Sequence, residues 1–150
     1  MMRRVMEYCK TFDLPLLLRS FEPTLSRGGL MNESLLSTVM GLASIPGEAE
    51  TIAVARDIEL AALTGARVHL GQLSTAGSVR LLRTARARGL AVTGDVTPHH
   101  LTLTERATET YDTNTKVFPP FRSEEDRSEL IAGLSDGTLS AIATNHEPQN

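Results

Sequence analysis

The sequence predicts an α/β fold built on parallel strands. Short apolar stretches alternate with segments of helical periodicity along the 150-residue chain, and short connections join them. The clearest examples are the apolar run Leu14–Leu18, which turn signals bound, and the helical pattern Pro46–Leu63, which Gly65 ends. Such an alternation is typical of βα units. We expect about four of them, with parallel strands, in one domain over residues 1–150.

The expected elements follow one another in a regular order. Helices are predicted over Met2–Thr11, Pro46–Leu63, Thr104–Thr110 and Glu124–Leu134, and another, capped by Ser74 or Thr75, is predicted to run to about Arg88. Strands are predicted over Leu14–Leu18, Arg67–Leu73, Leu90–Val96 and Ser140–Thr144. The remaining segments are predicted to be polar or loop-like, namely Ser26–Asn32, Thr97–His100 and Val117–Arg122. The continuous apolar character of the first strand favours burial on both of its faces.

The composition excludes several classes of protein. The formal net charge is −3, from 15 basic and 18 acidic residues, which argues against a strongly basic nucleic-acid-binding protein. No apolar run reaches the roughly 18 residues that a membrane span needs. Arg3 and Arg4 are followed by no apolar stretch typical of a signal peptide. The single cysteine, Cys9, excludes an internal disulfide and favours a reducing compartment, so we expect a cytoplasmic protein.

Polar and titratable residues follow each predicted strand. They are Arg19-Ser20, Gln72–Thr75, Asp95–His100 and Asn145-His146. In parallel α/β folds the functional groups collect in the loops after the carboxyl ends of the strands. We therefore expect these four clusters to lie near one another.

Four segments together resemble the dihydroorotase family of the amidohydrolase superfamily. They are Asp95-Val-Thr-Pro-His-His-Leu101, Tyr111–Val117 with Pro119-Pro120 and Arg122, Leu73-Ser-Thr-Ala-Gly-Ser78, and Ala141-Ile-Ala-Thr144 with His146. The resemblance implies a (β/α)8 barrel with a two-zinc site, whose metal-bound hydroxide interconverts dihydroorotate and carbamoyl aspartate in pyrimidine synthesis. Zinc lowers the pKa of bound water and polarises the carbonyl. A whole barrel needs about 250 residues. The resemblance implies that this chain corresponds to its second half, an amidohydrolase-like C-terminal half with strands five to eight.

The chain departs from the family pattern at the positions that carry the chemistry. The resemblance places metal ligands at Arg19, Gln72 and Asn145, where the family has His, His and Asp. The family aspartate, at Asn145, also shuttles the proton. Two substrate positions are substituted as well, because Phe118 replaces the asparagine before Pro-Pro and Gln149 replaces the final histidine.

The substituted side chains are poor partners for zinc. A guanidinium has no lone pair to offer and is always charged, so Arg19 cannot bind the metal. The amide of Gln72 offers only a neutral oxygen, whereas zinc prefers thiolate, imidazole and carboxylate. Asn145 cannot exchange a proton near neutral pH. We therefore expect no catalytic residue, no metal ligand and no cofactor in this chain.

The histidines and the cysteine have structural interpretations. On an extended strand His69 and Gln72 point to opposite faces, so His69 is expected to pack or hydrogen-bond between sheet and helix. His99, His100 and His146 are expected to be structural, with a weak new metal site as the alternative. Cys9 is expected in the core.

The arginines of the predicted helix Thr75–Arg88 give it a basic side. The preferred interpretation is a solvated helix face, and the alternative is contact with an acidic partner or a nucleotide. Gly28-Gly29 does not fit a phosphate-binding loop, because no strand precedes it and no helix follows at the required spacing.

Three functional hypotheses remain open. In the first, the chain is a non-catalytic dihydroorotase-like protein with a structural or partner-binding role; the resemblance suggests aspartate carbamoyltransferase as the partner. In the second, it is a zinc-dependent dihydroorotase that acts with a missing N-terminal half, which would carry a His-x-His pair and a bridging acid. In the third, it is a degenerate fragment. An open half-barrel exposes strand edges, so we also expect self-association or pairing through these edges.

Overall fold

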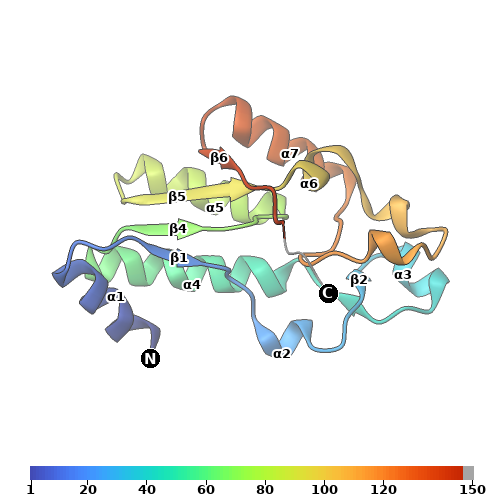
Figure 1. Cartoon of the computed structure of the whole chain (residues 1–150), viewed down its shortest axis with the longest axis horizontal. Helices are drawn as coiled ribbons and strands as arrows, with labels where there is room; N and C mark the ends of the chain where they lie inside the picture. Colours follow the sequence, from blue (N-terminus) through green and yellow to red (C-terminus); the bar gives the residue numbers. More distant parts are fainter. Residues whose placement is uncertain (147–150) are drawn as a thin grey trace.

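The computed structural model describes residues 1–146, and Gln149 lies outside them. Four parallel strands form the main sheet in the order β1-β4-β5-β6, with β1 at Leu16–Leu18, β4 at Val68–Leu70, β5 at Val92–Val96 and β6 at Ala141–Ile142. The predicted α/β class with parallel strands is confirmed (Figure 1).

Four helices cover one face of this sheet. They are α1 (Met2–Thr11), α4 (Glu48–Thr64), α5 (Ala76–Ala87) and α7 (Glu124–Ser135). Each packs against the next in this order, α1 on α4, α4 on α5 and α5 on α7. Two predicted helix-end signals are confirmed, the cap at the start of α5 and the glycine at the end of α4. Thr75 caps α5 through its hydroxyl, and Gly65 ends α4 at a positive φ of 68°.

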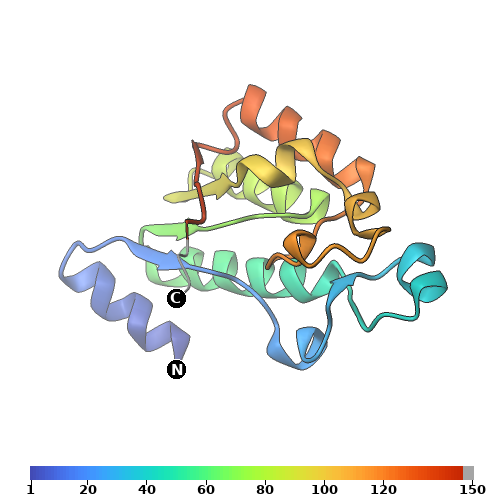
Figure 2. The same cartoon turned by 45° about the vertical axis from the view of Figure 1, so that its right-hand side comes forward.

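The main core lies between the sheet and these helices. It contains Met6 of α1, Ile58 of α4, Leu70 of β4, Leu82 of α5 and Leu130 of α7, among others. Gly94 of β5 allows this packing, because a Cβ there would lie 2.7 Å from a methyl of Leu82. The opposite face of the sheet carries no covering element among residues 1–146, as Figure 2 shows.

The first strand is shorter and more exposed than the sequence predicts. Leu16 and Leu18 pack against the core, but Leu17 points to the uncovered face and 71% of its surface is exposed. The expectation of burial on both faces is therefore wrong. The apolar run suits a strand whose second face would be covered, and no described residue covers it.

Residues between β1 and α4 form a small module that the sequence analysis missed. It comprises α2 (Pro23–Ser26), β2 (Met31–Asn32), α3 (Leu35–Met40) and β3 (Ser44–Ile45), with β2 and β3 paired in parallel. The two strands have two residues each, too few to produce a visible period of two. The module projects to one side of the main sheet (Figure 1).

Two further expectations need correction after β5. The predicted loop Thr97–His100 is instead the start of α6 (Pro98–Thr102), where Pro98 occupies the first helical turn. Proline is favoured there because its missing N–H would be unpaired in any case. The predicted helix Thr104–Thr110 is a single 3-10 turn, η1 (Glu105–Thr108), and a second turn, η2, covers Thr113–Thr115. The predicted loop Val117–Arg122 is confirmed.

Candidate functional site

Three side chains that follow three different strands meet at one end of the sheet. Arg19 follows β1, Gln72 follows β4 and Asn145 follows β6. Asn145 Oδ1 accepts a hydrogen bond from Arg19 Nη2 at 3.2 Å and another from Gln72 Nε2 at 2.5 Å. The carboxyl ends of parallel strands lie at one edge of a sheet, so the expected convergence of these positions is confirmed.

The backbone at this cluster adopts unusual dihedrals. Gln72 has a φ of 59° and Asn145 a φ of 51°, in the left-handed region that residues with a Cβ rarely occupy. Gln72 Oε1 is buried and has no hydrogen-bond partner among the described residues. Strained dihedrals and an unpaired buried acceptor gather at functional sites more than elsewhere, so the strand ends remain the candidate site.

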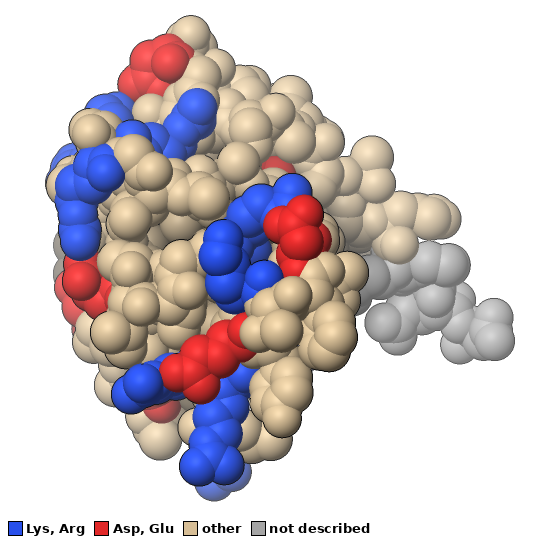
Figure 3. All heavy atoms as spheres, turned by 90° about the vertical axis from the view of Figure 1, so that its left-hand side faces the viewer, with Lys and Arg blue, Asp and Glu red and all other residues tan. Residues whose placement is uncertain are grey.

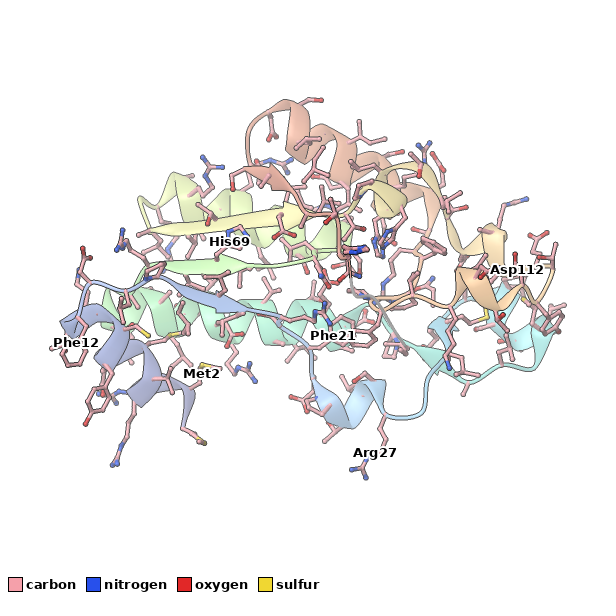
Figure 4. All side chains as sticks on the ribbon, in the orientation of Figure 1. Met2, Phe12, Phe21, Arg27, His69 and Asp112 are labelled. Atoms are coloured by element: carbon pink, nitrogen blue, oxygen red, sulfur yellow. The ribbon has the colours of Figure 1, made fainter. Side chains whose placement is uncertain are left out.

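His69 lies on the uncovered face of the sheet, not between sheet and helix as predicted. It is in register with Leu17 of β1 and Thr93 of β5, and its ring lies beside β5 (Figure 4). Its Nε2 donates to Asp95 Oδ2 at 2.8 Å, and Thr93 Oγ1 lies 2.7 Å from its Nδ1. The other oxygen of Asp95 accepts from the backbone N–H of Gln72 at 2.7 Å. Asp95 therefore links His69 to the loop that carries Gln72.

A pocket of about 240 Å³ opens between β1 and β4 at these strand ends. Arg19, His69, Gln72 and Asp95 contribute its polar lining. The guanidinium and the amide do not fit zinc, and the imidazole and carboxylate are bonded to each other. Across residues 1–146, no three His, Cys, Asp or Glu side chains are grouped so that they could hold a metal ion.

An aromatic pair lies near the strand-end cluster. The rings of Phe21 and Phe118 have centroids 4.6 Å apart and are tilted by 53°. Phe118 stands at the position that the resemblance assigns to a substrate-binding asparagine, and Phe21 stands two residues after Arg19. A phenyl ring offers no hydrogen bond to a polar substrate. The rings of Phe21 and Phe118 thus form an apolar contact with each other.

A fully buried polar network lies beside the site, and the sequence analysis missed it. Glu50 of α4 is 1% exposed. Its carboxylate accepts hydrogen bonds from the backbone N–H and the hydroxyl of both Ser74 and Thr75, at 2.5 to 3.1 Å. These bonds fix the loop that leads from β4 into α5. A glutamate inside a helical pattern normally indicates a solvated face, so only the pairing with a capping loop could have revealed it.

Arg122 extends this network to the small module. Its Nε donates to Ser74 Oγ at 3.2 Å, and its Nη1 donates to Asn32 Oδ1 at 2.8 Å and to the carbonyl of Ile45 at 2.9 Å. Asn32 in turn donates to Glu105 at 2.7 Å. Burial lowers the pKa of Arg122, against the opposing effect of nearby carboxylates led by Glu50. The guanidinium therefore joins β2, β3 and the loop after β4.

The adjacent histidines have structural surroundings. The His100 ring donates from Nε2 to the carbonyl of Pro120 at 3.2 Å, and its Nδ1 lies 2.6 Å from the Thr97 hydroxyl. Burial lowers the pKa of His100 to about 4 and also lowers that of His99. Because both ring nitrogens of His100 are engaged, the alternative metal site of His99, His100 and His146 is not formed. His146 is exposed.

The arginines of α5 contact neighbouring helices and loops. Arg83 pairs with Glu129 and Asp136, and Arg80 pairs with Glu125, all on or next to α7. Arg88, just past the helix, pairs with Glu59 of α4. The expected solvated face is therefore a set of surface ion pairs. Figure 3 shows basic and acidic side chains together on the face that contains α1.

Cys9 of α1 is half-buried and stands outside the main core, which corrects its predicted place inside that core. The buried side chain of α1 is Met6. A thiol at the margin of the core behaves as a small apolar group.

Curated proteins match the chain over nearly its full length. It is 52% identical over 147 residues to a dihydroorotase of Caldanaerobacter subterraneus subsp. tengcongensis, and this alignment covers 98% of the chain. It is 49% identical over 150 residues to a dihydroorotase of Syntrophobacter fumaroxidans. The chain is a homologue of proteins named dihydroorotase. It spans about a third of the length of these relatives, 34% in both cases. No protein-family model matches.

Solved structures with a similar fold are named dihydropyrimidinase and D-hydantoinase. The chain superposes on a dihydropyrimidinase from Brevibacillus agri with a TM-score of 0.81, 24% identity, and coverage of 99% of this chain and 34% of that one. A D-hydantoinase from a Bacillus species gives a TM-score of 0.80 at 22% identity. These likenesses support the predicted fold, part of a barrel of parallel βα units. No helix within residues 1–146 is long and apolar enough to cross a membrane.

Proposed function

We propose that this chain is a dihydroorotase-like protein that does not catalyse amide hydrolysis. The observation that supports the proposal is the direct contact of Arg19, Gln72 and Asn145 through the Oδ1 atom of Asn145. These are the three positions where the resemblance places metal ligands. A permanent positive charge and two neutral amides occupy them, so the site disfavours a divalent cation.

The proposal also accounts for the aromatic pair. The rings of Phe21 and Phe118 contact each other, and Phe118 stands at a position where the resemblance places a hydrogen-bonding substrate contact. When a hydrogen-bonding group of a site or its substrate is removed, kcat/KM for that substrate falls by several powers of ten. Metal-dependent hydrolysis and binding of the polar substrate would thus be lost together.

Metal content and turnover test this proposal. The purified chain is dialysed against zinc, the zinc per chain is measured, and dihydroorotate turnover is assayed in both directions. We expect well under one zinc per chain and no turnover. Stoichiometric zinc or measurable turnover would overturn the proposal.

A restored ligand set sharpens the same experiment. The triple variant Arg19→His, Gln72→His, Asn145→Asp should raise zinc affinity at least tenfold, because imidazole and carboxylate replace the guanidinium and amides. The matched control is Arg27→His with Asn114→Asp on exposed surface, which should leave zinc binding unchanged. Equal zinc affinity in the triple variant and the control would contradict the role assigned to these positions.

The structural role that we propose is binding of aspartate carbamoyltransferase. It rests on the resemblance alone, since the family includes inactive members that serve this enzyme as structural partners. Co-purification and sedimentation of the two proteins at micromolar concentration test it. Absence of a complex at these concentrations would count against the partner without affecting the proposal of inactivity.

A second candidate function is dihydroorotase activity together with a separate N-terminal half. It is favoured by the names of relatives at about 50% identity and by the short span of this chain along them. His69 and Asp95 would then be the titratable pair nearest the reacting groups. Turnover that appears only when the remaining barrel half is supplied would establish this function and refute the first.

A further inference from the structure

A recess beside Gly71 lies within the pocket at the strand ends. Gly71 directly follows β4, and its backbone N–H donates to the Leu18 carbonyl at 2.8 Å. A Cβ at Gly71 would lie 3.6 Å from that carbonyl oxygen and 3.7 Å from Asp95 Oδ2, which are ordinary van der Waals distances. The missing side chain therefore leaves space for a ligand group next to a carboxylate oxygen.

The pocket holds one cation and one carboxylate. Arg19, after β1, and Asp95, on β5, both line it. Gln72 stands between them, because its backbone N–H donates to Asp95 Oδ1 at 2.7 Å and its amide shares Asn145 Oδ1 with the Arg19 guanidinium. A ligand that carries only a negative charge is repelled by the carboxylate, and one that carries only a positive charge is repelled by the guanidinium. The pocket therefore favours a ligand with both charges.

The Asp95 side of the pocket offers hydrogen-bond acceptors. Asp95 Oδ2 accepts from His69 Nε2 at 2.8 Å, and a carboxylate oxygen can accept a second hydrogen bond. Gln72 Oε1 is a buried acceptor without a hydrogen-bond partner among residues 1–146. An unpaired buried acceptor is costly, so a donor that reaches it is favoured. An ammonium group, which carries three N–H donors, suits these two oxygens.

The Arg19 side of the pocket suits a carboxylate. A guanidinium presents its N–H groups in a planar fork that matches two carboxylate oxygens. Leu17 and Leu18 add an apolar lining. The pocket has about 240 Å³, whereas pockets for drug-sized ligands start at about 300 Å³. The ligand is therefore small and has an apolar part.

We propose that this pocket binds a small α-amino acid in its zwitterionic form. The carboxylate pairs with Arg19, the ammonium donates to Asp95 Oδ2 and Gln72 Oε1, and a side chain of about the size of a methyl group lies against Leu17. The inference rests on the proposed function, because a strand end without metal leaves Arg19 as the cation of the site. It adds a ligand to a site that the proposed function describes only as inactive.

Titration with alanine tests the class of ligand. NMR titration of the full, isotope-labelled chain in buffer with EDTA should shift the amide signals of Gly71 and Gln72, with a dissociation constant of about 1 mM or lower. Ethylamine and propionate each keep one of the two charged groups. Each should bind at least tenfold more weakly, because one charge-assisted hydrogen bond is lost. N-carbamoylalanine, which has no ammonium group, should be weakened by the same factor.

Several results would overturn the inference. They are the absence of any shift at about 20 mM alanine, equal affinity for alanine and propionate, and tighter binding of N-carbamoylalanine than of alanine. Binding of alanine that requires zinc and disappears with EDTA would refute both the inference and the proposed function. A chain without zinc, without turnover and without alanine binding would refute the inference alone.

Gly71→Ala tests where the ligand lies. The added methyl group fits without a clash and Gly71 does not have a left-handed φ, so folding, checked by circular dichroism, should persist. The methyl group fills the recess and should weaken alanine binding at least tenfold. Gly47→Ala is the matched control, because its Cβ would meet Thr75 Cγ2 at a similar 3.5 Å outside the pocket. Equal affinity in the two variants would contradict the proposed place.

Arg19→Met tests the contact with the carboxylate. In this variant alanine should bind no more tightly than ethylamine, because the partner of the carboxylate is gone. Arg27→Met, at an exposed arginine after α2, is the matched control and should keep the preference for alanine. A preference for alanine that survives in Arg19→Met would overturn the assignment of Arg19.

Discussion

The strand-end cluster and the buried network around Glu50 share the loop after β4, yet they differ in how their carbonyl and carboxylate groups and their backbone are accommodated. In the network, a carboxylate at 1% exposure is satisfied by four donors from Ser74 and Thr75. In the cluster, Asn145 and Gln72 adopt left-handed dihedrals and one amide oxygen has no partner. The Glu50 carboxylate is satisfied, although Nη2 of Arg122 in the same network has no hydrogen-bond partner among the described residues, and the cluster alone combines an unpaired polar atom with left-handed dihedrals at Gln72 and Asn145.

Three residues of the buried network lie in segments that match the family pattern, whereas the residues of the strand-end cluster lie at positions that depart from it. Ser74, Thr75 and Arg122 belong to matching segments and take part in the network. Arg19 and Gln72 depart from the pattern and form the cluster. Residues of the matching segments thus hold the loop after β4 in place, while the resemblance assigns the substituted positions to the groups that the loops present. Scaffold and chemistry are carried by different residues.

The largest effect is expected from Glu50→Gln. The substitution removes the charge that stabilises the buried Arg122 and places an amide NH₂ against donors, so the free energy of unfolding should fall by about 3 kcal/mol. Denaturant titration followed by circular dichroism measures it. The matched control is Glu59→Gln, in an exposed pair with Arg88, which should cost under about 1 kcal/mol. Equal losses in the two variants would erase the distinction between the buried network and the surface.

The second effect concerns pH. The pKa of His100 is lowered to about 4 by burial, whereas an unfolded histidine titrates near 6.5. The unfolded state therefore binds the proton first, so stability is complete above pH 6.5 and falls as the pH drops toward 4. The loss should reach about 3 kcal/mol, measured by denaturant titration at several pH values. His100→Gln should flatten this profile, and His146→Gln, at an exposed site, should leave it unchanged.

The third effect probes backbone strain in the cluster. At a φ of 59°, Gln72→Gly should be about 1 kcal/mol more stable than Gln72→Ala, because glycine adopts left-handed dihedrals without a Cβ clash. Thermal or chemical unfolding of both variants measures the difference. Alanine and glycine variants of equal stability would show that the left-handed dihedral costs nothing here.

The smallest effect is expected at the α5–α7 contact. Arg83 pairs with Glu129 and Asp136, but 38% of its side chain is exposed, so solvent screens both pairs. Arg83→Met keeps the aliphatic packing and should lower the free energy of unfolding by less than about 1 kcal/mol. A loss as large as that of Glu50→Gln would mean that the surface pairs, and not the buried network, hold these helices.

The sequence predicts best those features that local chemistry determines. The caps at Thr75 and Gly65, and the meeting of Arg19, Gln72 and Asn145 at one edge, follow from residue type and from the geometry of parallel strands. The small module escaped prediction because its strands are two residues long.

Features that depend on distant neighbours could not be predicted. His69 was assigned to the wrong face because strand alternation gives relative directions only, and the turn at Gln72 interrupts that alternation. Glu50 is indistinguishable in sequence from a solvated helical glutamate, since its partners lie more than twenty residues away. The exposure of Leu17 likewise depends on what faces the strand, which its own sequence does not encode.

The small module has its own buried side chains, Met31 and Ile45, and neither belongs to the main core. It is attached to the rest of the chain by hydrogen bonds from Arg122 to Asn32 and the Ile45 carbonyl, from Asn32 to Glu105, and from the Tyr111 hydroxyl to the Met40 carbonyl. Such a segment forms a separate cooperative unit, able to open while the main sheet stays closed. Amide hydrogens of β2 and β3 should therefore exchange with deuterium well before those of β4 and β5. Two levels of protection within one short chain are the expected consequence of a module whose buried side chains lie outside the main core.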